Sequence, residues 1–370
     1  MKFLDLKKQY KQIASEINSA IKRVLNNGVF IGGEEVNNFE KEVAGFCNIK
    51  FALAVNSGTD AIFLSLKALG VQEGDEIITT PFTFIATAEA IANCGAKPVF
   101  VDIDPVTFNI DVDQIENKIT KKTKVILPVH VFGQMVNMDK IMKLAHRYKL
   151  SVVEDAAQSF GSFYKGKLAG AVGRIGCYSF FPSKNLGAYG DGGMIVTDNK
   201  KIMEKIKLLK NHGSSSKDKY KNLILGINSR LDSIQAAILR VKLKHLNKWM
   251  EEKRKKAAVY NKELSAVKKI ILPQVLINNK HTYHQYSIRV IEERNDLHNF
   301  LQQAGIPTMI YYSLPLHLQP AFKYLGYKKG DFPNSEMVSQ EVLSLPLYPE
   351  FSQAEQKLVI NKIKTFFKVI

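Results

Sequence analysis

Short apolar segments recur along the first two hundred residues and alternate with longer stretches of helical periodicity. Several of them are continuous apolar runs, as expected of strands that are buried on both faces. We expect seven strands, at 51–55, 76–80, 97–102, 124–130, 151–155, 174–181 and 193–197. Helical patterns between them cover 59–69, 83–93, 138–148 and 200–211. This alternation predicts an α/β fold with an open, mainly parallel sheet covered by helices.

The pattern changes near Arg230, where a long helical period begins. Shorter elements follow it: strands at 285–290 and 306–311, and helices at 296–304, 334–343 and 352–367. We therefore divide the chain into a large domain, residues 1–246, and a smaller C-terminal α+β domain, residues 247–370. The polar stretch 213–222 is expected to be a mobile loop.

Composition narrows the class of protein. The chain has 370 residues, of which 45% are hydrophobic and 24% charged, as in ordinary globular proteins. It has no apolar run of the roughly 18 residues that a membrane span needs, and its first residues lack the apolar core of a signal peptide. The 3 cysteines have no metal-ligand spacing. These features are typical of a cytoplasmic protein.

The net charge of +17 raises the question of a nucleic-acid partner. The basic residues are scattered lysines, and no basic-aromatic module or DNA-reading motif accompanies them. A positive field also attracts an anionic nucleotide-linked substrate, and we favour that interpretation over nucleic-acid binding. His212, His281 and His284 are not spaced as a metal site, and we predict no metal.

The strongest chemical signal is Lys184. It follows Pro182 and Ser183 on a turn at the end of the expected strand 174–181, and a glycine-rich stretch leads on to the next strand. Upstream, an apolar run ends in Asp155, at the carboxyl end of another expected strand, where ligands of such sheets bind. The adjacent Glu154 is a competing acid, but neighbouring strand residues point to opposite faces, so only one of the two can face a ligand.

A third signal is the Ser57-Gly58-Thr59 sequence, which opens the helical pattern 59–69. Alone, it is usually a helix cap. Backbone amides at a helix start also bind phosphate, and hydroxyl groups add donors. A lysine, an acid and such a helix start are together the parts of a pyridoxal-phosphate site, which needs an amine for the aldehyde and an anion for the ring nitrogen.

The same segments, with others, resemble one family. They are FLDLKKQY (3–10), FIGGEEVNNFE (30–40), AVNSGTDAIFLSLKALG (54–70), GINSRLDSIQAAILRVKL (226–243) and YYSLPLHLQPAF (311–322). In this order they resemble the DegT/DnrJ/EryC1/StrS sugar aminotransferases over essentially the whole chain. The resemblance implies an aspartate-aminotransferase-like fold (fold type I), with a seven-stranded, mainly parallel sheet in the large domain, and pyridoxal 5′-phosphate as cofactor.

The resemblance also implies residue roles. Lys184 would bond to the cofactor aldehyde and shuttle a proton, Asp155 would face the ring nitrogen, and Gln158 the phenolic oxygen. The phosphate would be bound by Ser57, Gly58, Thr59 and Ser179. Phe84 would stack on the ring, although core packing is the alternative. Residues tentatively assigned to the substrate are Arg230, Tyr311 and His317. Asn228 would bind the phosphate of a neighbouring subunit, which implies a homodimer with shared active sites.

The reaction that the resemblance implies moves the amino group of L-glutamate to a nucleotide-linked keto sugar. The turn after Lys184 is most similar to that of enzymes that make dTDP-3-amino-3,6-dideoxyhexoses, and Phe181 stands where C4-acting relatives more often have a histidine. We therefore expect amino transfer to C3 of a dTDP-3-keto-6-deoxyhexose. The alternative is a C4 aminotransferase acting on a UDP- or dTDP-4-keto-6-deoxy sugar. Two hypotheses from other functional classes are that the protein is a cofactor-binding regulator without turnover, or that it binds nucleic acid.

Overall fold

The computed structural model describes residues 1–215, 218 and 220–369, and a seven-stranded sheet lies at its centre. The strands follow the order β1-β9-β8-β5-β4-β2-β3. Their bounds are β1 Phe51–Val55, β2 Glu76–Thr79, β3 Lys97–Phe100, β4 Thr123–Ile126, β5 Ser151–Asp155, β8 Ile175–Ser179 and β9 Gly193–Thr197. Only β9 runs antiparallel to its neighbours β1 and β8. The mainly parallel α/β sheet predicted from the sequence is confirmed.

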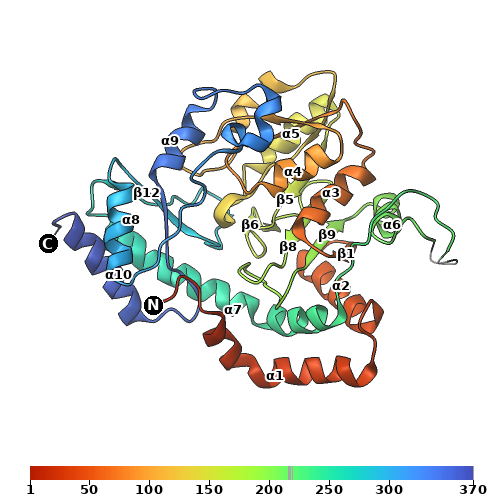
Figure 1. Ribbon diagram of the computed structural model, residues 1–370, viewed down its shortest axis with the longest axis horizontal. Coiled ribbons are helices and arrows are strands. Elements are labelled where there is room, and N and C mark those ends of the chain that lie inside the picture. The colour runs from red at the N-terminus through yellow and green to blue at the C-terminus, as the bar shows by residue number, and fades with distance from the viewer. Residues whose placement is uncertain (216–217, 219, 370) are drawn as a thin grey trace.

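Helices cover both faces of this sheet (Figure 1). One face packs against α3 Gly58–Ala68, α4 Ala86–Asn93 and α6 Lys200–Leu209. The other packs against α1 Leu6–Asn27, α2 Gly33–Cys47, α5 Met138–Tyr148 and the first part of α7 Ser233–Leu264. Each face has its own apolar core, and α3 to α6 lie where the helical periodicity predicted them.

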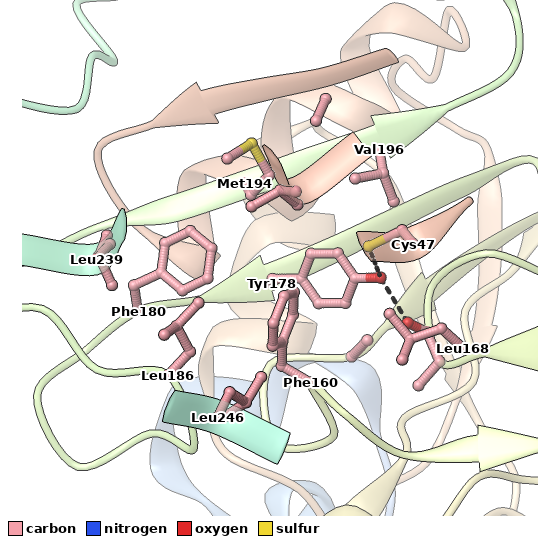
Figure 2. Close-up of a cluster of buried hydrophobic side chains, with 14 of the residues drawn as sticks. Cys47, Phe160, Leu168, Tyr178, Phe180, Leu186, Met194, Val196, Leu239 and Leu246 are labelled. Atoms are coloured by element: carbon pink, nitrogen blue, oxygen red, sulfur yellow. Dashed lines mark hydrogen bonds between the residues drawn. The ribbon is translucent and has the colours of Figure 1, made fainter. Parts of the chain in front are cut away.

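Alternation along β8 decides which side chains reach which face. Tyr178 points into the core beneath α2 and α7, where its hydroxyl lies 3.5 Å from Cys47 Sγ (Figure 2). The ring of Phe160 meets the Tyr178 ring edge-on, with centroids 4.8 Å apart. Cys177 packs in the opposite core, under α3. Because side chains alternate along a strand, Ser179 is directed to the α3 face as well.

The second half of the chain is built around α7, which has 32 residues. Figure 1 shows it running from beneath the sheet to the smaller C-terminal unit. That unit contains a three-stranded sheet, β10-β12-β13, with a separate apolar core to which α7 contributes from Ala257 onward. Its elements are β10 Ile270–Ile271, β12 Tyr286–Val290, β13 Val342–Leu345, α8 Arg294–Gln303, α9 Pro333–Glu341 and α10 Gln353–Phe366. The division at 246/247 falls inside the continuous α7 and remains a proposal.

The remaining elements are short. A second small sheet pairs β11 Asn279–Lys280, β6 Phe163–Tyr164 and β7 Lys167–Leu168. Short 3-10 helices lie at Val112–Gln114, Glu116–Lys118, Val131–Gly133, Leu316–Leu318 and Pro320–Leu325. Among the described residues, no helix is both long enough and apolar enough to span a membrane.

The structure corrects two expectations in the C-terminal unit. The strand expected at 306–311 is reduced to an isolated bridge between Met309 and Ser344. The helix expected at 334–343 ends at Glu341, and Val342–Leu345 forms a strand that pairs with β12. Short apolar runs fit either a buried strand or a buried helix turn, so sequence periodicity does not separate the two.

One further expectation concerns the polar stretch 213–222, which the sequence predicts to be mobile. Part of it, residues 216, 217 and 219, lies outside the described residues. The ends of the stretch meet in a bridge between Ser214 and Asn222.

Candidate active site

A cavity of about 430 Å³ opens where β5 and β8 end, next to the start of α3. It brings together most of the side chains that the sequence singled out. Its walls include Lys184, Asp155, Gln158 and Phe84, together with Ser57, Gly58, Thr59 and Ser179. Tyr311 also lines it. These residues come from five separate stretches of the chain, so the fold gathers them at the sheet edge where ligands of parallel sheets bind.

Lys184 is positioned by a tight turn. Its backbone amide donates to the carbonyl of Phe181 at 2.8 Å. The backbone amide of Ala188 donates to the carbonyl of Phe180, also at 2.8 Å. Burial lowers the pKa of the Lys184 amine to about 8, against the opposing attraction of the Asp155 charge. A lysine with a lowered pKa supplies free amine near neutral pH, as covalent chemistry with a carbonyl requires.

Asp155, the last residue of β5, is 5% exposed. One carboxylate oxygen accepts from Thr87 Oγ1 at 2.7 Å, and the other accepts from the Ala157 amide at 3.1 Å. Burial raises the pKa of Asp155, while these two hydrogen bonds and the charge of Lys184 act to lower it. The donors therefore favour the carboxylate in a place where burial alone would protonate it.

Glu154 faces the opposite side of the sheet. Its carboxylate is fully buried and accepts hydrogen bonds from His130 Nε2 at 2.8 Å and from the Gly170 and Val172 amides at 2.8 Å each. Burial raises the pKa of Glu154, but these donors outweigh it and hold the pKa below the usual value. Of the two adjacent acids, Asp155 is the one that lines the cavity.

The start of α3 forms one end of the cavity. Ser57 is the N-cap residue, and its Oγ accepts from the Asp60 amide at 3.0 Å, which leaves its hydroxyl proton available to a ligand. A Cβ on Gly58 would lie 2.7 Å from Ser179 Cβ, and a Cβ on Gly193 would lie 2.3 Å from the Ser57 carbonyl oxygen. Only glycine at these two positions lets β8, β9 and the helix start approach so closely. The resulting cradle of amides and hydroxyls suits an anion.

Two flat side chains complete the cavity wall. Phe84, just before α4, is 58% exposed, so the alternative that it only packs in the core is wrong. Gln158 uses both ends of its amide within the protein: Oε1 accepts from the Phe132 amide at 2.9 Å, and Nε2 donates to the Tyr312 hydroxyl at 2.8 Å. The Gln158 amide nitrogen carries two N–H groups and donates one of them to Tyr312, so the second is free for the expected hydrogen bond to a ligand.

Three residues with expected roles lie away from this cavity. His317 is 2% exposed, its Nε2 lies 3.0 Å from Glu336 Oε1, and its ring packs against Phe332. The structure thus places His317 in a separate cluster, contrary to the expectation that it faces a substrate. Asn228 is exposed and forms a bridge with Asn211, and Arg230 follows it in the same segment; neither lines the cavity of its own chain.

The structure adds residues that sequence reasoning missed. Thr83, Thr87, Asp191 and His284 all line the cavity. The signal for the two threonines was their position around Phe84 in the sequence TPFTFIATAEA, at i and i+4 on one helical face. Asp191 lies in the glycine-rich stretch after Lys184. Within the described ranges, no group of His, Cys, Asp and Glu side chains could hold a metal ion.

Comparison with known proteins gives one consistent result. The model of the DegT/DnrJ/EryC1/StrS aminotransferase family matches residues 11–364. A protein of Geobacillus stearothermophilus described as a pleiotropic regulatory protein is 49% identical, over 99% of this chain and 98% of its own length. The dTDP-3-amino-3,6-dideoxy-alpha-D-galactopyranose transaminase of Aneurinibacillus thermoaerophilus is 41% identical, over 98% of this chain and 99% of its own.

A solved structure agrees with these sequence matches. The crystal structure of DesV from S. venezuelae in complex with a ketimine intermediate superposes with a TM-score of 0.97 at 38% identity, covering 100% of this chain and 99% of DesV. The fold thus corresponds to that of a solved aminotransferase of this family.

Proposed function

Because the chain belongs to the DegT/DnrJ/EryC1/StrS aminotransferase family, we propose that it transfers the amino group of L-glutamate to C3 of a dTDP-3-keto-6-deoxyhexose. That it is a pyridoxal-phosphate-dependent aminotransferase acting on nucleotide-linked sugars follows from the family. The carbon, the nucleotide and the amino donor are the proposal. The product would be a dTDP-3-amino-3,6-dideoxyhexose.

The residues of the cavity fit the cofactor. When bound, pyridoxal phosphate supplies an aldehyde that takes up an amino group and a ring that accepts electrons. Lys184 offers an amine with a lowered pKa for the aldehyde, and Asp155 offers a buried carboxylate for the ring nitrogen. The start of α3 offers amides and hydroxyl groups for the phosphate, with Ser179 beside it. The half-exposed Phe84 offers a flat surface for the ring.

In this assignment Lys184 moves the proton that amino transfer requires. Its free Nζ would take the proton from the α-carbon of glutamate and, in the second half of the reaction, deliver a proton to the sugar carbon that receives the amine. Asp155 lies close enough to Lys184 for its charge to raise the pKa of that amine, so the two groups are coupled. The same amine would serve both halves, and ping-pong kinetics are expected.

Phe181 is the observation that carries the choice of C3 over C4. It is 52% exposed and lines the cavity, at the position where C4-acting relatives more often have a histidine. A phenyl ring offers no hydrogen bond there, so it favours an acceptor with a different group at that point. The 3-amino product in the name of the Aneurinibacillus relative supports the same choice.

Product analysis tests this assignment. The enzyme would be incubated with L-glutamate and a panel of 3-keto and 4-keto sugars, each linked to dTDP or UDP, and the carbon bearing nitrogen located by NMR. We expect amination of the dTDP-linked 3-keto sugar with a kcat/KM at least about tenfold above the others. Preferred amination at C4 would establish the alternative, a C4 aminotransferase acting on a UDP- or dTDP-4-keto-6-deoxy sugar.

A regulatory role is a second candidate, favoured by the description of the Geobacillus relative. The site argues for turnover, because Lys184 and Asp155 are both present and both line the cavity. A protein that held the cofactor but aminated no nucleotide-linked sugar would support the regulator.

We also propose that the active form is a homodimer with shared sites. The segment before Asn228 exposes large apolar side chains: Tyr220 is 88% exposed, Leu223 53% and Leu225 97%. Apolar groups that gather on one exposed segment are typical of a surface that a partner covers. In the proposed dimer Asn228 would serve the phosphate in its neighbour's cavity, the role that the family resemblance implies for it.

Replacing Asn228 by alanine should weaken cofactor retention without dissociating the dimer. Removing one amide donor to a phosphate should speed cofactor release roughly tenfold. Release would be followed by the loss of cofactor fluorescence on dilution, and the dimer by light scattering. Asn361→Ala makes the same chemical change at an exposed position of α10, outside that segment, and should leave release unchanged. Full activity of a monomer would contradict the shared site.

A further inference from the structure

Asp155 does not stand alone on the cavity wall, because Thr87 of α4 and Thr83, just before that helix, line the cavity beside it. Thr87, in the first turn of α4, donates from Oγ1 to the Asp155 carboxylate at 2.7 Å. Thr83 Oγ1 lies 3.1 Å from Thr87 Oγ1. Thr83 and Thr87 are 2% and 1% exposed, so water competes little for these hydroxyl groups.

The number of available protons decides which group donates in each of these two hydrogen bonds. An ionised carboxylate only accepts, so the single hydroxyl proton of Thr87 is committed to Asp155. The contact between the two hydroxyl groups then requires Thr83 to donate to Thr87. A donor that itself accepts a hydrogen bond is polarised and becomes a better donor. Both threonines therefore stabilise the anionic form of Asp155 and oppose the effect of its burial.

We propose that Thr87, assisted by Thr83, is a positioning residue that keeps Asp155 ionised and fixes the orientation of its carboxylate toward the ring nitrogen of the cofactor. This inference rests on the proposed role of Asp155. One oxygen is held by Thr87 and the other by the Ala157 amide at 3.1 Å, so the carboxylate plane has little freedom to rotate. Phe84 lies between the two threonines in the sequence, so the same segment carries the proposed ring-stacking residue.

Other groups near Asp155 also influence its charge. Lys184 and His130 favour the anion, while burial disfavours it. The Tyr312 hydroxyl and the Cys177 thiol lie close enough to respond to the Asp155 charge, and burial raises the pKa of each, so both stay neutral near pH 7. Among these groups, Thr87 is the one whose side chain donates directly to the carboxylate. Removing the Thr87 hydroxyl therefore measures how much the hydrogen bonds of the two threonines stabilise the Asp155 anion.

Thr87→Val in the holoenzyme tests the proposal, since valine keeps the shape and loses the donor. Loss of the donor raises the pKa of Asp155, so Asp155 becomes protonated at a higher pH. We expect the pH at which the bound cofactor changes its absorption spectrum to move upward, together with the acidic limb of the pH–rate profile. The glutamate half-reaction should slow roughly tenfold to a hundredfold, as loss of a bond to a charged group implies. Thr87→Ser should restore both readouts.

Thr83→Val provides an independent arm, because it removes the second donor without touching Asp155. Thr83→Val should shift the same spectral transition in the same direction by a smaller amount. It also allows the proposal to be contradicted if Thr87→Val does not fold. An unshifted spectral transition in either valine variant, or failure of Thr87→Ser to restore it, would overturn the proposal. Asp155→Asn distinguishes failure of this proposal from failure of the proposed role of Asp155. If Asp155→Asn leaves the cofactor spectrum unchanged, the proposed role of Asp155 is itself wrong.

Discussion

Lys184→Ala abolishes amino transfer in this account and removes the absorption band of the lysine-bound cofactor. The lysine has two tasks, to bond to the aldehyde and to move the proton, and alanine performs neither. Loss of a side chain that acts directly on the reacting atoms lowers rates by roughly a millionfold in comparable cases, which is below detection here. Absorption spectra of the purified variant and a glutamate half-reaction measure both effects.

Two controls accompany this variant. Lys200→Ala changes an exposed lysine whose side chain is 75% accessible, and it should leave spectrum and rate unchanged. A small added amine should restore part of the half-reaction to Lys184→Ala, because it replaces the missing base. Transamination at the normal rate by Lys184→Ala would sink the assignment of this lysine, whatever the fate of the rest of the site.

Asp155→Asn is expected to lower the rate by roughly a hundredfold to a thousandfold while part of the cofactor stays bound. Asparagine is nearly isosteric but neutral, so it cannot stabilise a positive charge on the ring nitrogen. The phosphate cradle at α3 is unaffected, which is why binding survives. Single-turnover experiments with glutamate measure the rate, and the cofactor content after gel filtration measures how much cofactor stays bound.

The neighbouring acid gives a matched comparison. Glu154→Gln should lower the melting temperature, because the amide cannot accept all the hydrogen bonds that His130 and the backbone amides now donate. The cofactor spectrum of the folded variant should be that of the unaltered enzyme, since Glu154 does not line the cavity. Near-normal kinetics of Asp155→Asn together with a spectral change in Glu154→Gln would exchange the roles of the two acids.

The sequence predicts the central sheet well because its strands are buried on both faces. A buried strand such as β9 is an uninterrupted apolar run between turn residues, and its periodicity has one interpretation. The C-terminal unit is harder, as the segment 334–345 shows. There a helix passes directly into the strand Val342–Leu345, and the apolar side chains on both sides of Glu341 fit either element until β12 pairs with the strand.

The site is predictable to the extent that its residues belong to the turns that end strands. Lys184, Asp155 and Ser57 each follow or end an apolar run, and the fold brings them together. Thr87 was missed because its i, i+4 spacing from Thr83 does not identify a partner, and only the approach of α4 to β5 brings it to Asp155. His317 was misplaced because burial beside Glu336 depends on α9, which is nearby only in the folded chain.

The most direct test is a two-stage half-reaction on the purified enzyme. L-Glutamate would first convert the bound cofactor to its amino form, and the free glutamate would be removed. A dTDP-linked 3-keto sugar or its 4-keto isomer would then be added separately, while the absorption band of the lysine-bound cofactor is followed. The account predicts return of that band with the 3-keto sugar and not with the 4-keto sugar. Return with the 4-keto sugar alone would contradict it.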